Sequence, residues 1–65
     1  MKITVNGSPR DTAATTLAAL LDDLGQGDAK LATAVNESFV PAALRASHAL
    51  APGDRVEIVA PRQGG

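Results

Sequence analysis

The stretch "TTLAALLDDLG", Thr15 to Gly25, has the spacing of an amphipathic helix. Its leucines recur at i, i+3, i+4 and i+7, which places them along one side of a helix; they are Leu17, Leu20, Leu21 and Leu24. Thr15 or Thr16 can act as the N-cap, and Gly25 suits the left-handed conformation that ends a helix. A chain of 65 residues needs this apolar stripe for its core, so we expect the leucines to be buried.

The residues before this helix show the alternation of a strand followed by a turn. Apolar and polar residues alternate in "KITV", residues 2–5, as in a half-buried strand. "NGSP", residues 6–9, has turn chemistry and predicts a hairpin whose return strand runs from Arg10 to about Ala13. That strand is short and poor in β-branched residues, as is typical of a sheet edge.

The residues after the helix predict a third strand and then an irregular segment. "KLATAVN", residues 30–36, places one set of side chains on a single face, namely Leu31, Thr33 and Val35. "NESF" then turns the chain into "FVP", where Pro41 ends any ladder. We expect a short helical turn or irregular structure in "AALRASHAL", residues 42–50.

The last part of the chain predicts a tight turn and a final strand. "PGD", residues 52–54, is turn sequence, and "RVEIVA" follows it at residues 55–60. In this strand Val56, Ile58 and Ala60 face opposite to Glu57 and Val59.

These elements predict an α+β fold with a mixed sheet of four to five strands packed on one α-helix. A helix after a hairpin can cross over in the right-handed sense, which would set the third strand parallel to the first.

The composition excludes several classes of protein and partner but does not identify a function. The 65 residues fit one domain, and the chain has no Cys, Trp or Tyr and a single aromatic residue, Phe39. Absence of Cys argues against a disulfide scaffold, and no signal peptide or membrane-spanning run is visible, so we expect a cytoplasmic protein. The net charge is −1 with scattered basic residues, which makes nucleic acid and membranes unlikely partners.

Catalysis by this chain alone is not expected. Its single histidine, His48, lies in a segment without paired carboxylates, and we expect it at the surface or at the core boundary. The glycines form no phosphate-binding loop and the carboxylates no metal-binding loop, so we expect neither a metal nor a bound cofactor. The sequence therefore predicts a substrate or ligand of an enzyme.

The chain carries one distinctive chemical group, the carboxylate after "APRQGG", residues 60–65. Glycines let a backbone enter a channel too narrow for side chains, and a carboxylate becomes reactive when it is activated, for example as a mixed anhydride with AMP. Taken alone, Gly64 and Gly65 indicate a frayed chain end more strongly than a functional one.

The sequence resembles the ThiS-type sulfur carriers of thiamine biosynthesis, ubiquitin-like β-grasp proteins of the MoaD/ThiS superfamily. The resemblance covers nearly the whole chain and rests on "KITVNG", "TTLAALLDDLG", "AVNESFVP" and "LAPGDRVEIVAPRQGG". It implies a β-grasp domain over residues 1–60 and a flexible tail over residues 61–65. Where family members often carry a charged residue and a Trp after the proline, this chain has "AALRAS", which leaves contacts there in doubt.

The resemblance also implies roles for the terminal residues. Gly65 would be adenylated by a ThiF-type activating enzyme with Mg-ATP and converted to a thiocarboxylate, with sulfur from a cysteine desulfurase or a rhodanese. A thiazole synthase would receive that sulfur. Gly64 would be the channel-fitting neighbour, and Arg62 and Gln63 would contact partners.

Two further points stay open. We expect an exposed apolar patch near the tail that includes Phe39 and Val59, although Phe39 could equally fill the core. The alternatives to the thiamine carrier are a MoaD-type carrier for molybdopterin synthesis, a ubiquitin-like protein modifier and a binding module with an inert tail.

Overall fold

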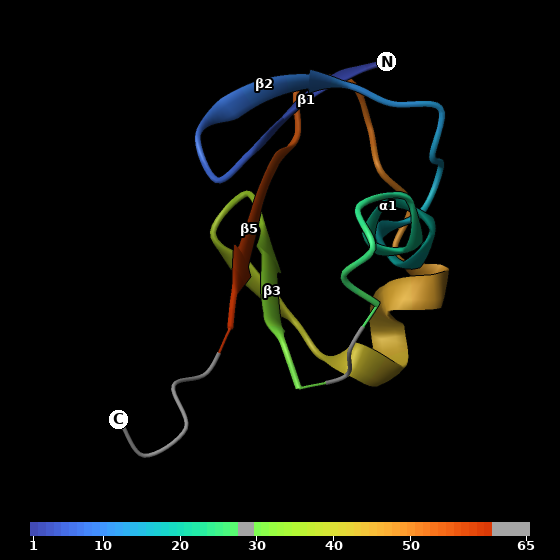
Figure 1. Ribbon diagram of the computed structural model, residues 1–65, viewed down its shortest axis with the longest axis vertical. Coiled ribbons are helices and arrows are strands. Elements are labelled where there is room, and N and C mark those ends of the chain that lie inside the picture. The colour runs from blue at the N-terminus through green and yellow to red at the C-terminus, as the bar shows by residue number, and fades with distance from the viewer. Residues whose placement is uncertain (28–29, 61–65) are drawn as a thin grey trace.

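A computed structural model describes residues 1–27 and 30–60 of the chain. Within these residues, five strands form one sheet, and a helix lies against one side of it (Figure 1). The elements in chain order are β1 (Lys2–Val5), β2 (Ser8–Asp11), α1 (Leu17–Asp23), β3 (Ala32–Val35), β4 (Ser38–Val40), the 3-10 helix η1 (Ala42–Ser47) and β5 (Arg55–Val59). The expectations for residues 61–65 lie outside the described residues.

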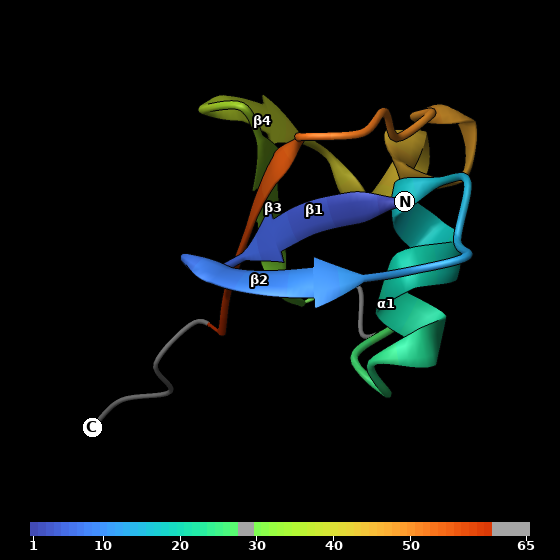
Figure 2. The ribbon, with the colours of Figure 1, turned by 90° about the horizontal axis from the view of Figure 1, so that it is seen from above.

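The sheet is mixed, with the strand order β2-β1-β5-β3-β4. β1 and β5 are parallel, whereas the β1–β2, β3–β5 and β3–β4 pairs are antiparallel. The expectation that the third strand runs parallel to the first is wrong: β3 does not pair with β1, and it runs opposite to the direction that β1 and β5 share. The last strand instead takes the central place between β1 and β3 (Figure 2).

The first hairpin is tighter than the sequence analysis predicts. β2 begins at Ser8, not at Arg10, because the turn consists of two residues, Asn6 and Gly7, with φ of 50° and 83°. Positive φ at both central residues is the type I′ turn for which Asn-Gly is the preferred pair. Pro9 therefore lies within β2, an edge strand that tolerates a missing backbone N–H.

Helix α1 begins and ends as its sequence predicts. The Oγ1 of Thr16 accepts a hydrogen bond from the backbone N–H of Ala19 at 3.2 Å, so Thr16 is the N-cap. Gly25 has φ of 71°, and its N–H donates to the carbonyl of Asp22 at 3.0 Å. The N–H of Gln26 donates to the carbonyl of Leu21 at 2.8 Å, which completes a Schellman motif.

The core lies between α1 and the inner face of the sheet. Leu17, Leu20 and Leu21 are exposed by 1% or less, as predicted, and Leu24 is partly buried. The other buried apolar residues come from strands and loops: Ile3, Ala14, Val35, Val40, Leu50, Val56 and Ile58. Ala60, which was expected on the same face as Val56 and Ile58, is exposed and follows the end of β5.

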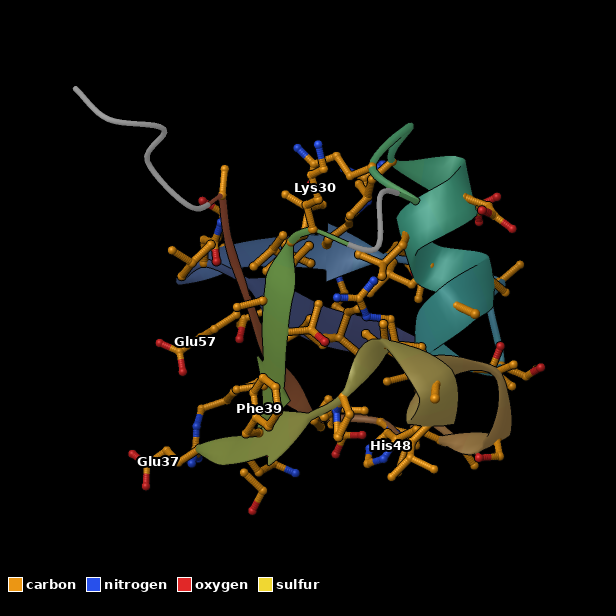
Figure 3. All side chains as sticks on the ribbon, turned by 90° about the horizontal axis from the view of Figure 1, so that it is seen from below. Lys30, Glu37, Phe39, His48 and Glu57 are labelled. Carbon is orange, nitrogen blue, oxygen red and sulfur yellow. The ribbon has the colours of Figure 1, made fainter. Side chains whose placement is uncertain are left out.

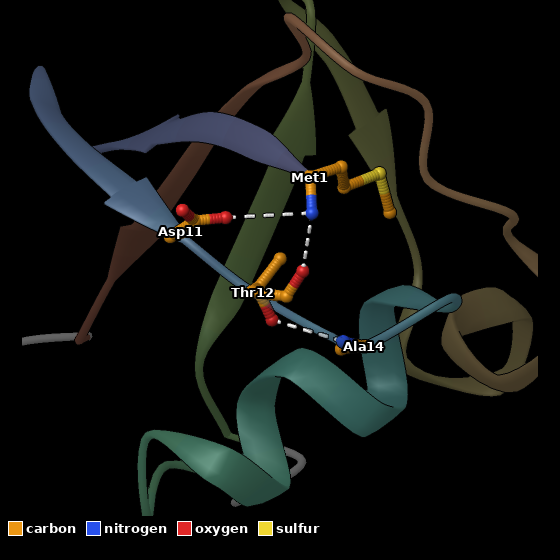
Figure 4. A network of polar contacts seen from close by, with 4 residues as sticks. All are labelled: Met1, Asp11, Thr12 and Ala14. Carbon is orange, nitrogen blue, oxygen red and sulfur yellow. Dashed lines mark hydrogen bonds and ion pairs between the residues drawn. The ribbon is translucent and has the colours of Figure 1, made fainter.

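The beginning of β1 is tied to the segment that leads into α1 (Figure 4). The amino group of Met1 donates to the carbonyl of Thr12 at 2.7 Å and lies 3.4 Å from the Asp11 carboxylate. The backbone N–H of Thr12 donates in turn to the Met1 carbonyl. The Thr12 Oγ1 accepts a hydrogen bond from the Ala14 N–H, closer to the helix. These contacts hold β1 in line beside the entrance to the helix.

The second hairpin, between β3 and β4, carries a residue in an unfavourable conformation. Its two turn residues, Asn36 and Glu37, have φ of 52° and 72°. The first hairpin has glycine at the second of these positions, whereas here a glutamate occupies the left-handed region. A residue with a side chain pays roughly 1–2 kcal/mol to adopt this conformation. Glycine would avoid that cost, but its greater freedom in the unfolded state would offset part of the gain in stability.

We therefore expect Glu37→Gly to raise the free energy of unfolding by up to about 1 kcal/mol, measured by urea denaturation. Glu57→Gly is the matched control, because Glu57 is an exposed residue of β5 without positive φ and its replacement should destabilise the domain. A loss of stability in Glu37→Gly would contradict this account of the turn.

Candidate functional site

The candidate site consists of the outer face of the sheet, opposite α1, together with the end of β5. Of the predicted site residues, Phe39 and Val59 lie within the described part of the chain. The predictions for Arg62, Gln63, Gly64 and Gly65 lie outside it, so their roles stay predictions.

An apolar patch covers part of this outer face. Phe39 is 69% exposed and Val59 is 61% exposed, which confirms that both are at the surface and that Phe39 is not core. The strand register places Phe39 opposite Ala34 and Val59 opposite Ala32, so the four side chains share one face. We call Ala32, Ala34, Phe39 and Val59 the outer patch.

The outer patch is hollowed between its two large residues. A shallow depression is lined by the outer patch together with Thr33 and Glu57. The two alanines form its floor because their side chains are too small to fill the space between Phe39 and Val59. Such a surface suits an apolar side chain of a partner protein.

Two carboxylates border the outer patch. Glu57 is paired with Ala34 across β5 and β3, and Glu37 lies in the turn that precedes Phe39. Both extend into solvent on the side away from α1 (Figure 3), and neither forms an ion pair with another described residue. The outer patch is therefore apolar with acidic groups at its border.

Two asparagines fasten β5, and the sequence analysis assigned them only to turns. Asn36 accepts a hydrogen bond from the Arg55 N–H at 2.9 Å, and its side-chain amide donates to Asp54 at 3.0 Å. Asn6 accepts from the Ile58 N–H at 2.8 Å and donates to the Ile58 carbonyl at 3.2 Å. The signal that could have found them is the asparagine in each turn, since asparagine combines left-handed φ with hydrogen bonding to backbone.

A buried arginine, also missed, supports the sheet from inside. Arg45 of η1 is 5% exposed, and its Nε donates to the Oγ1 of Thr33 at 3.1 Å. Its guanidinium also donates to the carbonyl of Leu31, and Thr33 donates to the carbonyl of Val40 at 2.8 Å. Arginine is seldom buried, so its sequence position carries no signal for this role.

The described residues do not assemble a reaction centre. His48 is half-buried, and its backbone carbonyl accepts from the Leu17 N–H. No three His, Cys, Asp or Glu side chains in residues 1–27 and 30–60 lie together as a metal site. The hollow between α1 and η1 measures about 180 Å³, below the roughly 300 Å³ of small-molecule sites, and the larger space of about 420 Å³ beside Met1 and Asp11 is nearly flat, open surface. No helix in this part of the chain has the length and apolar character needed to cross a membrane.

Solved structures resemble this fold over its whole length. The crystal structure of the thiamine biosynthesis protein (ThiS) from Geobacter metallireducens matches with a TM-score of 0.85 and 25% sequence identity, covering 100% of both chains. The NMR solution structure of a thiamine biosynthesis protein from the same organism matches with a TM-score of 0.80 and 28% identity, covering 100% of this chain and 88% of that one.

Sequence comparisons agree with the structural ones. A protein named thiazole synthase from Paramagnetospirillum magneticum is 41% identical over 66 residues, which cover 100% of this chain. The chain spans 20% of the length of that relative. The sequence also matches the ThiS family over residues 3–65. Together with the mixed five-stranded sheet and main helix formed by the described residues, this match shows that the chain belongs to the ThiS family of β-grasp proteins.

Proposed function

We propose that the protein is a sulfur carrier that supplies sulfur for thiazole formation in thiamine biosynthesis, with the carboxylate of Gly65 as the group that carries it. The main support is the ThiS family match, which extends through the Gly-Gly sequence to residue 65. The exposure of Phe39 and Val59 on the outer patch also supports it, because a protein cosubstrate needs a surface that its enzymes can contact.

The proposed chemistry loads the carrier in three steps. A ThiF-type activating enzyme with Mg-ATP joins the Gly65 carboxylate to AMP and releases pyrophosphate. The terminal persulfide sulfur of a cysteine desulfurase or rhodanese then attacks the acyl carbon and displaces AMP, and a thiol reductant cleaves the resulting acyl disulfide to leave a thiocarboxylate and a disulfide. Thiazole synthase takes up the sulfur, an oxygen atom from water or from its substrate replaces it on the carrier, and the carboxylate is regenerated.

The thiazole synthase partner is supported by the relative described above. That protein is named thiazole synthase and contains a segment 41% identical to this chain. A segment of this kind within a longer thiazole synthase favours the thiamine pathway over a MoaD-type role in molybdopterin synthesis.

The residues before Gly65 would help to bring its carboxylate into the active site of the partner enzyme. Gly64 would pass through a channel too narrow for a side chain. Arg62 and Gln63 would contact the walls of that channel through their polar groups and main chain.

The outer patch would dock the activating enzyme, and this role is testable by mutation. We expect the double substitution Phe39→Ser and Val59→Ser to weaken binding at least about tenfold, because exposed large apolar anchors dominate interfaces. The domain should stay folded, since both side chains are more than half exposed. Isothermal calorimetry with the activating enzyme and circular dichroism measure the two properties.

Leu44→Ser is the control for this prediction. Leu44 is 54% exposed but lies on η1, outside the outer patch. Binding of a folded double variant with wild-type affinity would remove the outer patch from the proposal.

Mass spectrometry of the intact protein tests the proposed function itself. The chain incubated with ATP, Mg²⁺, a sulfur donor and the activating enzyme should gain the mass difference between one sulfur and one oxygen atom. Protein from its native cell should show the same mass shift in part of the population. A chain found only joined to lysines of other proteins would favour a protein modifier, and a chain that never reacts would favour an inert tail.

A further inference from the structure

We propose that Asn6 is a positioning residue that fixes the end of β5 and thereby aligns the reactive chain end within the activating enzyme. The inference rests on the proposed carrier function and adds a residue in the first hairpin, far from Gly65 in the sequence. It comes from the way in which β1 ends before β5 does.

The β1–β5 ladder is short. Its register pairs are Thr4 with Arg55 and Val5 with Val56, and β1 then turns away at Asn6. The backbone N–H of Asn6 still donates to the Val56 carbonyl at 2.9 Å. Beyond this point the backbone of β1 no longer runs beside β5.

The side chain of Asn6 continues the pairing where the backbone stops. Its Oδ1 accepts from the Ile58 N–H at 2.8 Å and its Nδ2 donates to the Ile58 carbonyl at 3.2 Å. A carboxamide has the same donor and acceptor as a peptide group, so Asn6 serves as one more residue of the ladder. Its left-handed backbone, with φ of 50°, is what turns this side chain toward β5.

This contact fastens one side of the tail-proximal end of β5. On the other side, the β3 ladder holds β5 as far as Val59, which pairs with Ala32. Without the Asn6 amide, the contacts of Ile58 and Val59 with neighbouring strands in the described part of the chain would come from β3 alone. The end of β5 would then be held less firmly within the described part of the chain.

The placement of this end matters because the carrier would bind its enzyme at two places, the outer patch and the chain end. Val59 belongs to the outer patch and follows Ile58 directly, so Asn6 links the docking surface to the start of the reactive segment. Phe39, the larger anchor of the outer patch, is held by the pairing of β4 with β3 and not by Asn6, so loss of the Asn6 contact should disturb placement of the carboxylate more than docking affinity. Misplacement of reacting atoms by about 1 Å can reduce a rate about 100-fold.

The second turn provides a matched control. Asn36 has the same left-handed conformation, with φ of 52°, and it also accepts a backbone hydrogen bond from β5, from Arg55. It fastens the beginning of the strand, not the tail-proximal end. Glycine tolerates both positions, so Asn6→Gly and Asn36→Gly each remove a β5 contact without straining the turn.

The experiment compares the two variants in adenylation by the activating enzyme, followed through pyrophosphate release at a temperature where both are fully folded. We expect Asn6→Gly to lower kcat about tenfold with KM within about twofold of the wild type, and Asn36→Gly to leave kcat within about twofold. Asn6→Asp keeps the acceptor for the Ile58 N–H but sets a carboxylate oxygen against the Ile58 carbonyl in place of the donor, so its kcat should also fall.

Amide hydrogen exchange by NMR provides a readout that does not depend on activity. The Ile58 amide should exchange faster in Asn6→Gly and remain protected in Asn36→Gly. Equal kcat losses in the two glycine variants, or a change in KM alone, would overturn the positioning role. Failure of the wild-type chain to form any adenylate would instead overturn the proposed function, so the two failures are distinguishable.

Discussion

Leu21→Ala is expected to leave the domain largely unfolded at 25 °C. Leu21 is 1% exposed and belongs to the core formed by α1 and the sheet. Truncation of a buried leucine to alanine costs about 2–5 kcal/mol through lost burial and a residual cavity. A core of this size supplies roughly 3–5 kcal/mol in total, so the loss is comparable with the whole stability. Urea denaturation followed by circular dichroism measures it.

Leu44→Ala is the matched control for this substitution. Leu44 is 54% exposed on η1, and its truncation should change the free energy of unfolding by less than about 0.5 kcal/mol. If both variants unfolded at the same urea concentration, the leucine stripe of α1 would not be the core of the domain.

The features that the sequence predicted correctly depend on nearby residues. The leucine spacing, the Thr16 cap and the Gly25 termination all arise within a few residues of α1, where periodicity and capping chemistry act. Alternation likewise predicted which residues of β3 face inward, since Thr33 and Val35 are buried. Local patterns therefore predicted α1 and the inner face of β3, whereas Ala60, expected on the inner face of the last strand, is exposed after β5 ends.

The features that were wrong or missed depend on pairing across the chain. The strand order depends on which strands form hydrogen bonds with each other. The alternation in residues 30–36 predicts a strand but not whether that strand pairs with β1 or with β5. The return strand was placed too late because a two-residue turn admits Ser8 and Pro9 to the ladder. In both cases the hydrogen-bond partner, not the local pattern, decides the result.

The candidate site shows the same division. Phe39 and Val59 were predicted at the surface, and their register across β3 explains why they share a face. The Asn6 contact spans 52 positions to Ile58, and Arg45 reaches Thr33 only because η1 packs against α1, beside β3. Side chains that bind distant backbone carry no periodic signal, so a structure is needed to find them.

Deletion of Gly65 is expected to abolish formation of both the adenylate and the thiocarboxylate while leaving stability nearly unchanged. The buried core of the described residues runs from Ile3 to Ile58, and glycine has no side chain to bury. The melting temperature should therefore stay close to that of the wild type. The truncated carboxylate, in contrast, would stop about 3.5 Å short of the ATP α-phosphate, the length of one extended residue.

A shortfall of this size exceeds by several times the roughly 1 Å displacement that can cost about 100-fold in rate, so no product should be detected by intact-mass analysis. Gly64→Val keeps the chain length but places a branched side chain where the backbone must pass, and it should also fail. Leu44→Ser, which lies on η1 outside the outer patch, keeps both the length and the two glycines, and it should retain most of the activity. Among these variants only the deletion shortens the chain. Sulfur transfer to the chain without Gly65 would therefore show that the reaction does not depend on the position of the Gly65 carboxylate.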